Sequence, residues 1–379
     1  MKRFDVLVVG AGPAGSATAI RLARGGAGVL LVDRARFPRD KPCGGGLTGR
    51  ALRQAPCDVT SVVEHVVDRF RLRLRFRAEF ERTADEPLIL MTQRRRLDAY
   101  LVEQAAATGA DVRDGVRLDD VAVTPDAVTA TVGGERIVAD ILVGADGANG
   151  PIAKSTGLAG GISYGVALEG NVSWNDIDPD PYRGTAVVEL GQPAGGYGWI
   201  FPKGDHANLG VGGWGSGAPA LRAHLRHLCA VHGVPVEALA GVRGHRLPMR
   251  VPGATPPGRG RVLLVGDAAG LVDPLSGDGI YEAFASARLA AEAILSGAVA
   301  GYPAALAEAL DHHARASWAA KQALDRFPAL CFWAARSPGV FGVVAGLLQG
   351  DVGHPREARG IARPPLRLIA RMARGTTAG

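Results

Sequence analysis

The chain has 379 residues, of which 47% are apolar and 21% charged, with a formal net charge of +6. This length exceeds one compact core and predicts two or three domains, and the composition is that of a folded protein rather than a disordered one. The four cysteines form no CxxC pair and no nucleic-acid motif accompanies the arginines, so the sequence predicts a reducing compartment, no metal site and no nucleic-acid partner.

Residues 4–33 have the order strand, glycine turn, helix, strand, acid. An apolar, largely β-branched run at 5–9 predicts a strand buried on both faces, and Gly-Ala-Gly-Pro-Ala-Gly and a small-residue helix follow it directly. Glycines at this spacing make a tight turn, let the backbone approach a pyrophosphate and let helix and strand pack closely, while the helix N-terminus faces the phosphates. An acid closing the second strand accepts hydrogen bonds from a ribose diol. The predicted dinucleotide site comprises Gly10, Gly12, Pro13, Ala14, Gly15, Asp33 and Arg34.

The next stretch mixes loop, helix and strand patterns. Residues 34–47 are rich in glycine and proline and are expected to lie over the cofactor, and residues 48–68 are expected to be helical. Residues 69–80 alternate arginine with leucine and phenylalanine, which predicts a half-buried strand whose arginines form a solvated face. After a short strand at 88–91, a helix is expected to run to Thr108.

The remainder alternates between β-rich and helical patterns. A buried strand at 139–143 ends in a glycine turn, and strand candidates between 165 and 213 are separated by Pro and Gly, which predicts an antiparallel sheet. Another buried strand at 261–265 leads to an alanine-rich helix, after which the chain is mostly helical. The prediction is an α/β fold with a discontinuous Rossmann-like dinucleotide-binding domain (1–68, 92–160 and 255–300), a β-rich antiparallel substrate domain (69–91 and 161–254) and a C-terminal helical segment (301–379).

Three glycine turns after buried strands, at 10–15, 144–147 and 266–279, resemble the FAD-binding domain of the p-hydroxybenzoate hydroxylase-like flavoproteins. The resemblance implies FAD as cofactor and a helix N-terminus that stabilises negative charge on the reduced flavin. Gly150 and Ala153 stand where those families usually have serine and arginine, so a structural turn is at least as good an interpretation of Asp146 as a cofactor contact. By the resemblance, further FAD contacts come from Arg94, Asp267, Pro274, Gly277, Gly279 and Ile280.

Two stretches resemble the geranylgeranyl reductase family: Lys-Pro-Cys-Gly-Gly-Gly-Leu at 41–47 and Tyr-Gly-Trp-Ile-Phe-Pro-Lys at 197–203. The resemblance implies saturation of carbon–carbon double bonds in an isoprenoid chain on a lipid, quinone or diphosphate. It places Cys43, Gly44 and Gly46 beside the flavin, with Cys43 donating a proton, tuning the flavin or simply packing. It makes Tyr197, Trp199 and Phe201 the substrate-binding residues, the first two also catalytic, although the same aromatics also suit the core of a sheet.

Two alternative functions remain open: a flavin-dependent monooxygenase of the same fold, and a non-catalytic flavin-containing lipid-binding protein. No second GxGxxG motif is present for NADPH, so the electron donor is expected to be transiently bound NADPH or a reduced protein such as ferredoxin. Arginines at 363, 367, 371 and 374 oppose apolar residues, a pattern that suits an anionic membrane surface, although a solvated helix explains it as well. The expected location is the cytoplasm, with peripheral contact at the inner face of the membrane.

Overall fold

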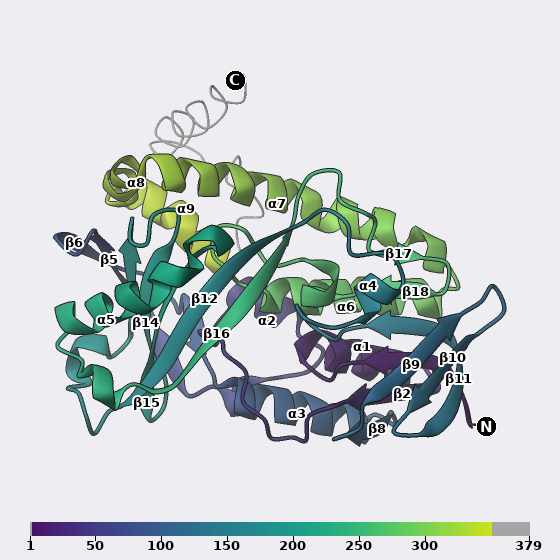
Figure 1. Ribbon diagram of the computed structural model, residues 1–379. Helices are drawn as coiled ribbons and strands as arrows, with labels where there is room; N and C mark the ends of the chain where they lie inside the picture. The colour runs from purple at the N-terminus through teal and green to yellow at the C-terminus, as the bar shows by residue number, and fades with distance from the viewer. Residues whose placement is uncertain (1, 351–379) are drawn as a thin grey trace.

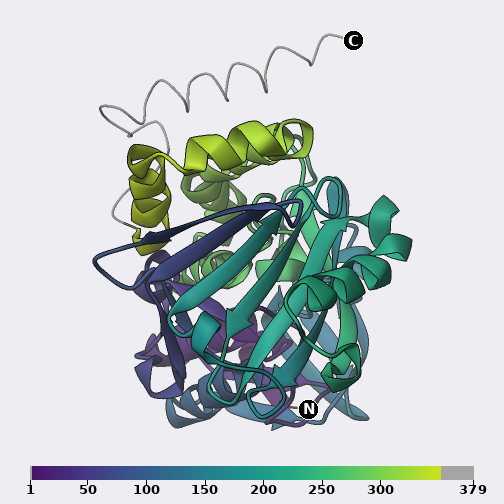
Figure 2. The ribbon, with the colours of Figure 1, turned by 90° about the vertical axis from the view of Figure 1, so that its left-hand side faces the viewer.

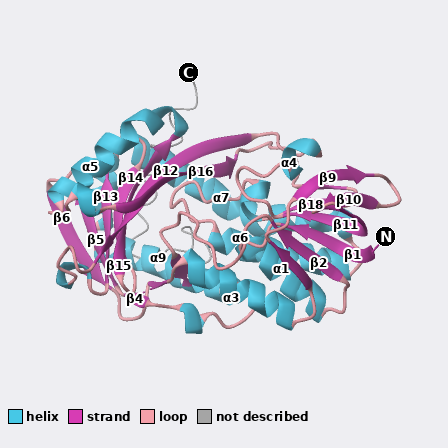
Figure 3. Cartoon of the chain, turned by 60° about the horizontal axis from the view of Figure 1, so that its bottom comes forward, coloured by secondary structure: helices cyan, strands magenta, loops and turns pink. Residues whose placement is uncertain are grey.

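The fold was analysed in a computed structural model that describes residues 2–350. Two sheets lie at opposite ends of the molecule, with helices between them (Figures 1 and 3). This arrangement confirms the predicted α/β class. The arginine-rich segment at 363–374 lies outside the described residues.

Within residues 2–350, one end of the molecule is an eight-stranded sheet whose centre is parallel. Alternate residues of the central strand face opposite cores: Val6 and Val8 pack against helices, whereas Leu7 packs toward the antiparallel strands on the other side. The spatial order is β17 (Gly258–Arg259), β18 (Val262–Leu264), β11 (Glu135–Gly144), β1 (Lys2–Val9), β2 (Val29–Asp33) and β8 (Asp111–Asp114), with β10 (Val128–Val132) and β9 (Leu118–Val123) pairing beside β11.

Helices from distant parts of the chain cover one face of this sheet. Small residues along α1 allow close contact with its neighbours, because Ala17 and Ala19 are fully buried beside Phe284. The helices of this layer are α1 (Pro13–Arg24), α3 (Arg94–Ala107) and α6 (Ile280–Leu295), and α4 (Ile152–Ser155) packs on the opposite face.

The other end is a seven-stranded sheet, seen from its outer side in Figure 2. It is antiparallel as predicted, except that β13 and β5 pair in parallel. The order is β16 (Ala240–Arg250), β12 (Ile162–Ser173), β15 (His206–Trp214), β14 (Tyr197–Pro202), β13 (Thr185–Leu190), β5 (Arg69–Leu74) and β6 (Ala78–Thr83).

Different helices cover the two faces of this sheet. Val187 and Ile200 pack toward α5 (Leu221–Val231), whereas Ala186 packs on the other side with α9 (Pro338–Gln349). The long α7 (Tyr302–Arg326) runs along the molecule between the two ends, and α8 (Pro328–Ala335) follows it (Figure 1).

Two local predictions were wrong. The helix expected at 48–68 ends early: α2 (Gly49–Gln54) gives way to a strand, β4 (His65–Val67), that pairs with β7 (Ile89–Met91). β3 (Gly46–Thr48) completes this small sheet. The region contains valine and threonine, whose branched side chains favour strands once a partner is available.

The strand expected over residues 69–80 is instead a hairpin. β5 and β6 turn at Arg75 and Phe76, whose φ angles are positive. The expected solvated arginine face is found for Arg75 and Arg77, which are exposed, but not for Arg71 and Arg73. Arg71 pairs with Glu81 at 2.6 Å, and Arg73 is only 16% exposed between Glu79 and Glu189.

Candidate active site

The glycine turn between β1 and α1 has space for a pyrophosphate. A Cβ at Gly10 (φ +102°) would lie 2.3 Å from the Ala145 carbonyl oxygen, and one at Gly15 would lie 1.7 Å from the Gly10 oxygen, so both positions require glycine. At Gly12, the N-cap of α1, the nearest atoms to a Cβ are guanidinium nitrogens of Arg39 and Arg94, at 3.6 and 3.8 Å. A helix N-terminus facing two cations is the chemistry that a pyrophosphate requires, so these residues fit FAD.

Arg94 is a buried cation held in place by a carboxylate. Its Nε and Nη2 donate to the two oxygens of Asp98, both at 2.7 Å, and Arg39 also contacts Asp98 at 2.9 Å. Burial alone would lower the pKa of Arg94, but Asp98 outweighs it and raises the pKa, so the guanidinium stays charged. Arg39 was not singled out from the sequence, because only the fold brings its loop to α3.

Asp33 holds the first turn with both carboxylate oxygens. One accepts a hydrogen bond from the Ala11 amide at 2.7 Å and the other from the Ala35 amide at 2.8 Å. The next residue, Arg34, is exposed. Asp33 therefore stands at the end of β2 in the position predicted for a ribose-binding acid.

Asp146 lies in the second glycine turn, where it fixes the chain. Its Oδ2 accepts a hydrogen bond from the Ile152 amide at 2.9 Å. A Cβ at Gly150 would lie 2.0 Å from the Asp146 carboxyl carbon, so the position of this carboxylate leaves no space for a side chain at Gly150.

Asp267, in the third glycine turn, faces a lysine and a histidine side chain. Its Oδ2 lies 3.1 Å from Lys41 Nζ and 3.7 Å from His245 Nε2. Burial alone would raise the pKa of Asp267, but Lys41 and His245 outweigh it and hold the pKa below its usual range. The ionised carboxylate thus links the glycine- and proline-rich loop at 34–47 to the third glycine turn. No sequence signal marks His245, which arrives on β16.

The loop before α6 is organised by Asp273. Its Oδ1 accepts hydrogen bonds from the Leu275 amide, the Ser276 amide and the Ser276 hydroxyl, at 3.1, 2.8 and 2.7 Å. The loop passes through Pro274 and Gly277 (φ +69°) and ends at Gly279, the N-cap of α6, before Ile280. The Tyr197 hydroxyl donates to the Ser276 carbonyl, which joins this loop to β14.

The Cys-Gly-Gly-Gly segment at 43–46, here called the Cys43 loop, packs against the face of β14 that carries Trp199 and Phe201. Cys43 is half-buried; its amide donates to Glu169 at 2.6 Å and its sulfur accepts from the Gly45 amide at 3.3 Å. A Cβ at Gly44 would lie 2.9 Å from the Phe201 ring, and one at Gly45 would lie 2.0 Å from the Lys203 Nζ.

The three aromatic residues of β14 therefore line one side of the strand, because alternate residues share a face. The Tyr197 and Trp199 ring centroids are 5.8 Å apart and those of Trp199 and Phe201 are 6.2 Å apart. The Trp199 indole donates to Asn208 at 2.8 Å, and Asn208 in turn donates to Asn171 at 2.9 Å, which fixes the tryptophan ring.

Glu169 and Lys203 are buried ionisable groups under the Cys43 loop that the site prediction missed. Burial raises the pKa of Glu169 and lowers that of Lys203. Lys203 donates to the Thr92 carbonyl at 2.7 Å. A cavity of about 140 Å³ opens beside them, lined by residues including Lys41, Cys43, Arg94, Glu169, Lys203 and Arg243.

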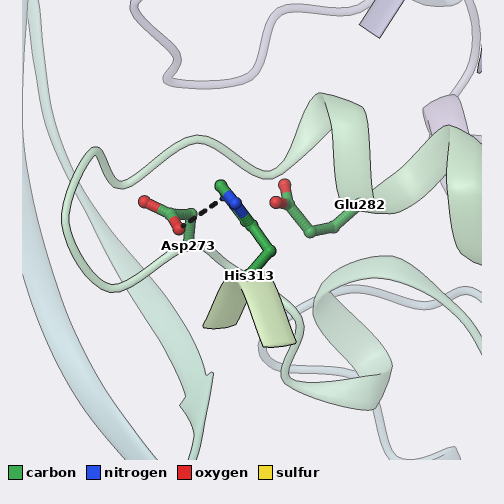
Figure 4. Close-up of side chains that lie close together, drawn as sticks. All are labelled: Asp273, Glu282 and His313. Carbon is green, nitrogen blue, oxygen red and sulfur yellow. Dashed lines mark ion pairs between the residues drawn. The ribbon is translucent and has the colours of Figure 1, made fainter. Parts of the chain in front are cut away.

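A second buried cluster lies behind the Asp273 loop, where Asp273, Glu282 and His313 converge (Figure 4). His313 Nε2 lies 3.6 Å from Asp273 Oδ2. Arg50 lies 2.5 Å from the same imidazole nitrogen and 3.3 Å from Glu282, so a guanidinium already stands beside the histidine and one of the two carboxylates. We therefore interpret the cluster as an anchor for the loop rather than as a metal site.

Comparisons with known proteins agree with this geometry. The family described as FAD binding domain matches residues 3–296. A menaquinone reductase of Mycolicibacterium smegmatis is 34% identical over 95% of both chains. A chloroplastic geranylgeranyl diphosphate reductase of rice is 34% identical over 79% of this chain and 68% of that protein.

A solved structure has the same fold. The geranylgeranyl bacteriochlorophyll reductase-like protein of Thermoplasma acidophilum aligns with a TM-score of 0.75 over 99% of this chain and 98% of that one, at 23% identity. That identity shows the fold alone; the family follows from the sequence relatives and the matched FAD-binding domain. The chain belongs to the geranylgeranyl reductase family of FAD-dependent oxidoreductases.

Proposed function

We propose that this oxidoreductase saturates carbon–carbon double bonds in an isoprenoid chain carried by a lipid, a quinone or a diphosphate. The observation that supports this most is the arrangement of β14. Its three aromatic residues face the Cys43 loop and the Asp273 loop, which carry FAD contacts predicted from the sequence. Relatives named menaquinone reductase and geranylgeranyl diphosphate reductase add support.

The chemistry requires an apolar, aromatic site. An isolated alkene accepts hydride poorly, so a proton must reach one carbon while positive charge develops on the other. Aromatic faces stabilise such a charge, and Tyr197, Trp199 and Phe201 present three of them in sequence along one strand. Bound FAD supplies the hydride. Excluding water prevents capture of the cation, and Trp199 is only 6% exposed.

Cys43 is our candidate for the group that handles the proton. Its side chain lies in the loop that packs on β14, and the Gly45 amide orients its sulfur. The hydrogen bond from the Cys43 amide to the Glu169 carboxylate anchors this loop to β12.

The electron donor we propose is NADPH or a reduced protein such as ferredoxin. Mixing the oxidised holoprotein anaerobically with NADPH tests this directly. Bleaching of the flavin absorbance indicates NADPH. An unchanged spectrum that bleaches on adding reduced ferredoxin indicates a protein donor.

The proposed activity is tested with the FAD-loaded protein reduced anaerobically by dithionite. Geranylgeranyl phospholipid, geranylgeranyl diphosphate and menaquinone are added in turn. We expect the absorbance of oxidised flavin to return without oxygen, with a product two mass units heavier for each bond reduced; menaquinone is weighed after its quinol has been reoxidised to the quinone, so that only alkene reduction adds mass. No reaction under nitrogen, followed by oxygen incorporation in air, would instead establish a monooxygenase.

A further inference from the structure

The two last described helices, α8 and α9, form an unusually apolar corner. Between residues 327 and 349 the only charged side chain is Arg336. No single helix within residues 2–350 is long and apolar enough to cross a bilayer; α8 and α9 pass that test only as a pair, and they meet at 91°. A bent pair of this kind suits a position in the interface of a bilayer.

The side of α8 and α9 that faces the protein covers the seven-stranded sheet on the face that carries Tyr197 and Phe201. The Phe332 ring of α8 packs 5.0 Å from Phe80, in a cluster that Tyr197 also joins. Phe341 of α9 belongs to a second cluster, which Phe201 joins. The same two helices therefore lie between the proposed prenyl site and the outside of the molecule.

The outer side of the corner presents apolar side chains to solvent. Trp333 is 53% exposed and Val344 is 40% exposed. Among residues 2–350, Trp333 is the one aromatic residue in the set of exposed large apolar side chains. The Arg336 guanidinium lies 5.4 Å from the Trp333 ring centroid. A tryptophan beside an arginine is typical of the boundary between lipid tails and headgroups.

The charge of the adjoining sequence favours an anionic partner. Residues 351–379 continue directly from the end of α9 and contain six arginines against Asp351 and Glu357. Arginines close to an anionic bilayer are attracted to its headgroups. In the sequence, the arginines of residues 351–379 thus follow the apolar helices α8 and α9 directly.

We propose that the α8–α9 corner docks this protein on an anionic lipid bilayer, with Trp333 and Val344 entering the interface. The docking itself is argued from these helices. Its use, delivery of a membrane-borne prenyl chain to the β14 face, rests on the proposed function.

The test measures binding of the full-length, FAD-loaded protein to vesicles of phosphatidylcholine with phosphatidylglycerol, by flotation. We expect wild type to bind, and Trp333→Glu and Val344→Glu each to weaken partitioning about tenfold, because a charge replaces apolar surface that must enter the interface. Val236→Glu is the matched control, since Val236 is 37% exposed on a different part of the molecule, and it should bind as wild type. Retained FAD shows that each variant is folded.

A second readout identifies the contact. Brominated lipids should quench wild-type tryptophan fluorescence, and Trp333→Phe should remove most of that quenching. Failure of wild type to bind at low salt, or wild-type binding by Trp333→Glu, would overturn the proposal. Protection of Trp333 fluorescence from acrylamide quenching in the absence of vesicles would also overturn the proposal, because residues 351–379 or a second copy of the chain would then already cover this surface.

Turnover separates this proposal from the reductase activity. Vesicle binding needs no catalysis, so it stands if no alkene is reduced. If the reductase is correct, Trp333→Glu should lower turnover of menaquinone in vesicles and leave turnover of dissolved geranylgeranyl diphosphate unchanged. Equal losses on both substrates would count against the docking role.

Discussion

At the scale of single residues, the site depends on buried charges that are paired within the protein. Arg94 and Arg39 share Asp98, which is fully buried, and both guanidinium groups border the space at Gly12. Because the carboxylate fixes the cations in position, FAD does not need to order them on binding.

Arg94→Ala should therefore weaken both the fold and FAD binding. Removing one partner leaves Asp98 buried with Arg39 alone, and breaking such a pair costs about 3 kcal/mol or more. Urea unfolding of the apoprotein measures the first effect, and titration with FAD measures the second. Arg95→Ala is the control, because Arg95 is exposed on the same helix turn. Equal FAD affinity in the two variants would contradict this role of Arg94.

Cys43 allows a test of proton handling. Cys43→Ser should lower the rate of alkene reduction by about 100-fold if the thiol is a general acid, with FAD content unchanged. Cys57→Ser changes another half-buried free thiol and should have no effect. Single-turnover flavin reoxidation and the flavin potential provide the measurements. If both stay at wild-type values in Cys43→Ser, the sulfur only packs.

Glu189 makes stability depend on pH. Burial raises the pKa of Glu189 to about 7, although its Oε2 lies 3.4 Å from Arg73. The folded state thus holds this proton more tightly than the unfolded chain does. The resulting stabilisation is complete below the unfolded pKa of about 4.3 and is lost as pH rises through about 7.

Residue 189 cannot ionise in the variant Glu189→Gln, so this variant lacks the pH dependence that Glu189 causes. The unfolding free energy of wild type minus that of Glu189→Gln should therefore fall by about 3 kcal/mol as the pH rises from 5 to 8. Urea unfolding at several pH values measures it. Glu79→Gln is the control, because Glu79 contacts the same arginine but is 55% exposed. A pH-independent difference would refute this origin of the effect.

At the scale of elements, two glycines of the first glycine turn serve different purposes, one the packing of the fold and the other the binding of FAD. Gly15 is required by the fold, because its Cβ would overlap the Gly10 carbonyl, whereas at Gly12 a Cβ meets only flexible arginine ends. Apoprotein stability and FAD affinity should therefore respond differently to alanine at the two positions.

Gly12→Ala should leave the unfolding free energy of the apoprotein within about 0.5 kcal/mol of wild type and weaken FAD at least about tenfold, because the added methyl occupies the pyrophosphate space. Gly15→Ala should destabilise the apoprotein by about 3 kcal/mol, the upper end for overpacking. Gly301→Ala, where a Cβ has open space, is the control. Normal FAD affinity in Gly12→Ala would contradict the placement of the phosphates.

Elements whose signal is local could be predicted from the sequence. The β1–α1–β2 unit and α6 were found because hydrophobic runs and glycine turns act over neighbouring residues. The strand β4 was mistaken for helix because its pairing with β7 depends on residues more than 20 positions away. The turn at Arg75 and Phe76 was missed because neither residue favours a positive φ.

At the scale of the whole molecule, the Cys43 and Asp273 loops bridge the distance between the two sheets: the first packs on Phe201 of β14, and the second accepts a hydrogen bond from the Tyr197 hydroxyl. The sequence predicted the motif residues themselves, Asp267 and Tyr197 among them. It did not predict partners such as His245 or Glu169, which arrive on strands of the other sheet. Tertiary packing creates those contacts, and no local pattern marks them.

The measurement that tests the central claim most directly is the mass of the product formed in D₂O. The reduced holoprotein is equilibrated in D₂O under nitrogen and given geranylgeranyl diphosphate. Both added hydrogens come from exchangeable positions, one as hydride and one as proton, so the account predicts four extra mass units per reduced bond, against two in H₂O. Unchanged substrate under nitrogen, or a product that carries oxygen after air is admitted, would contradict it.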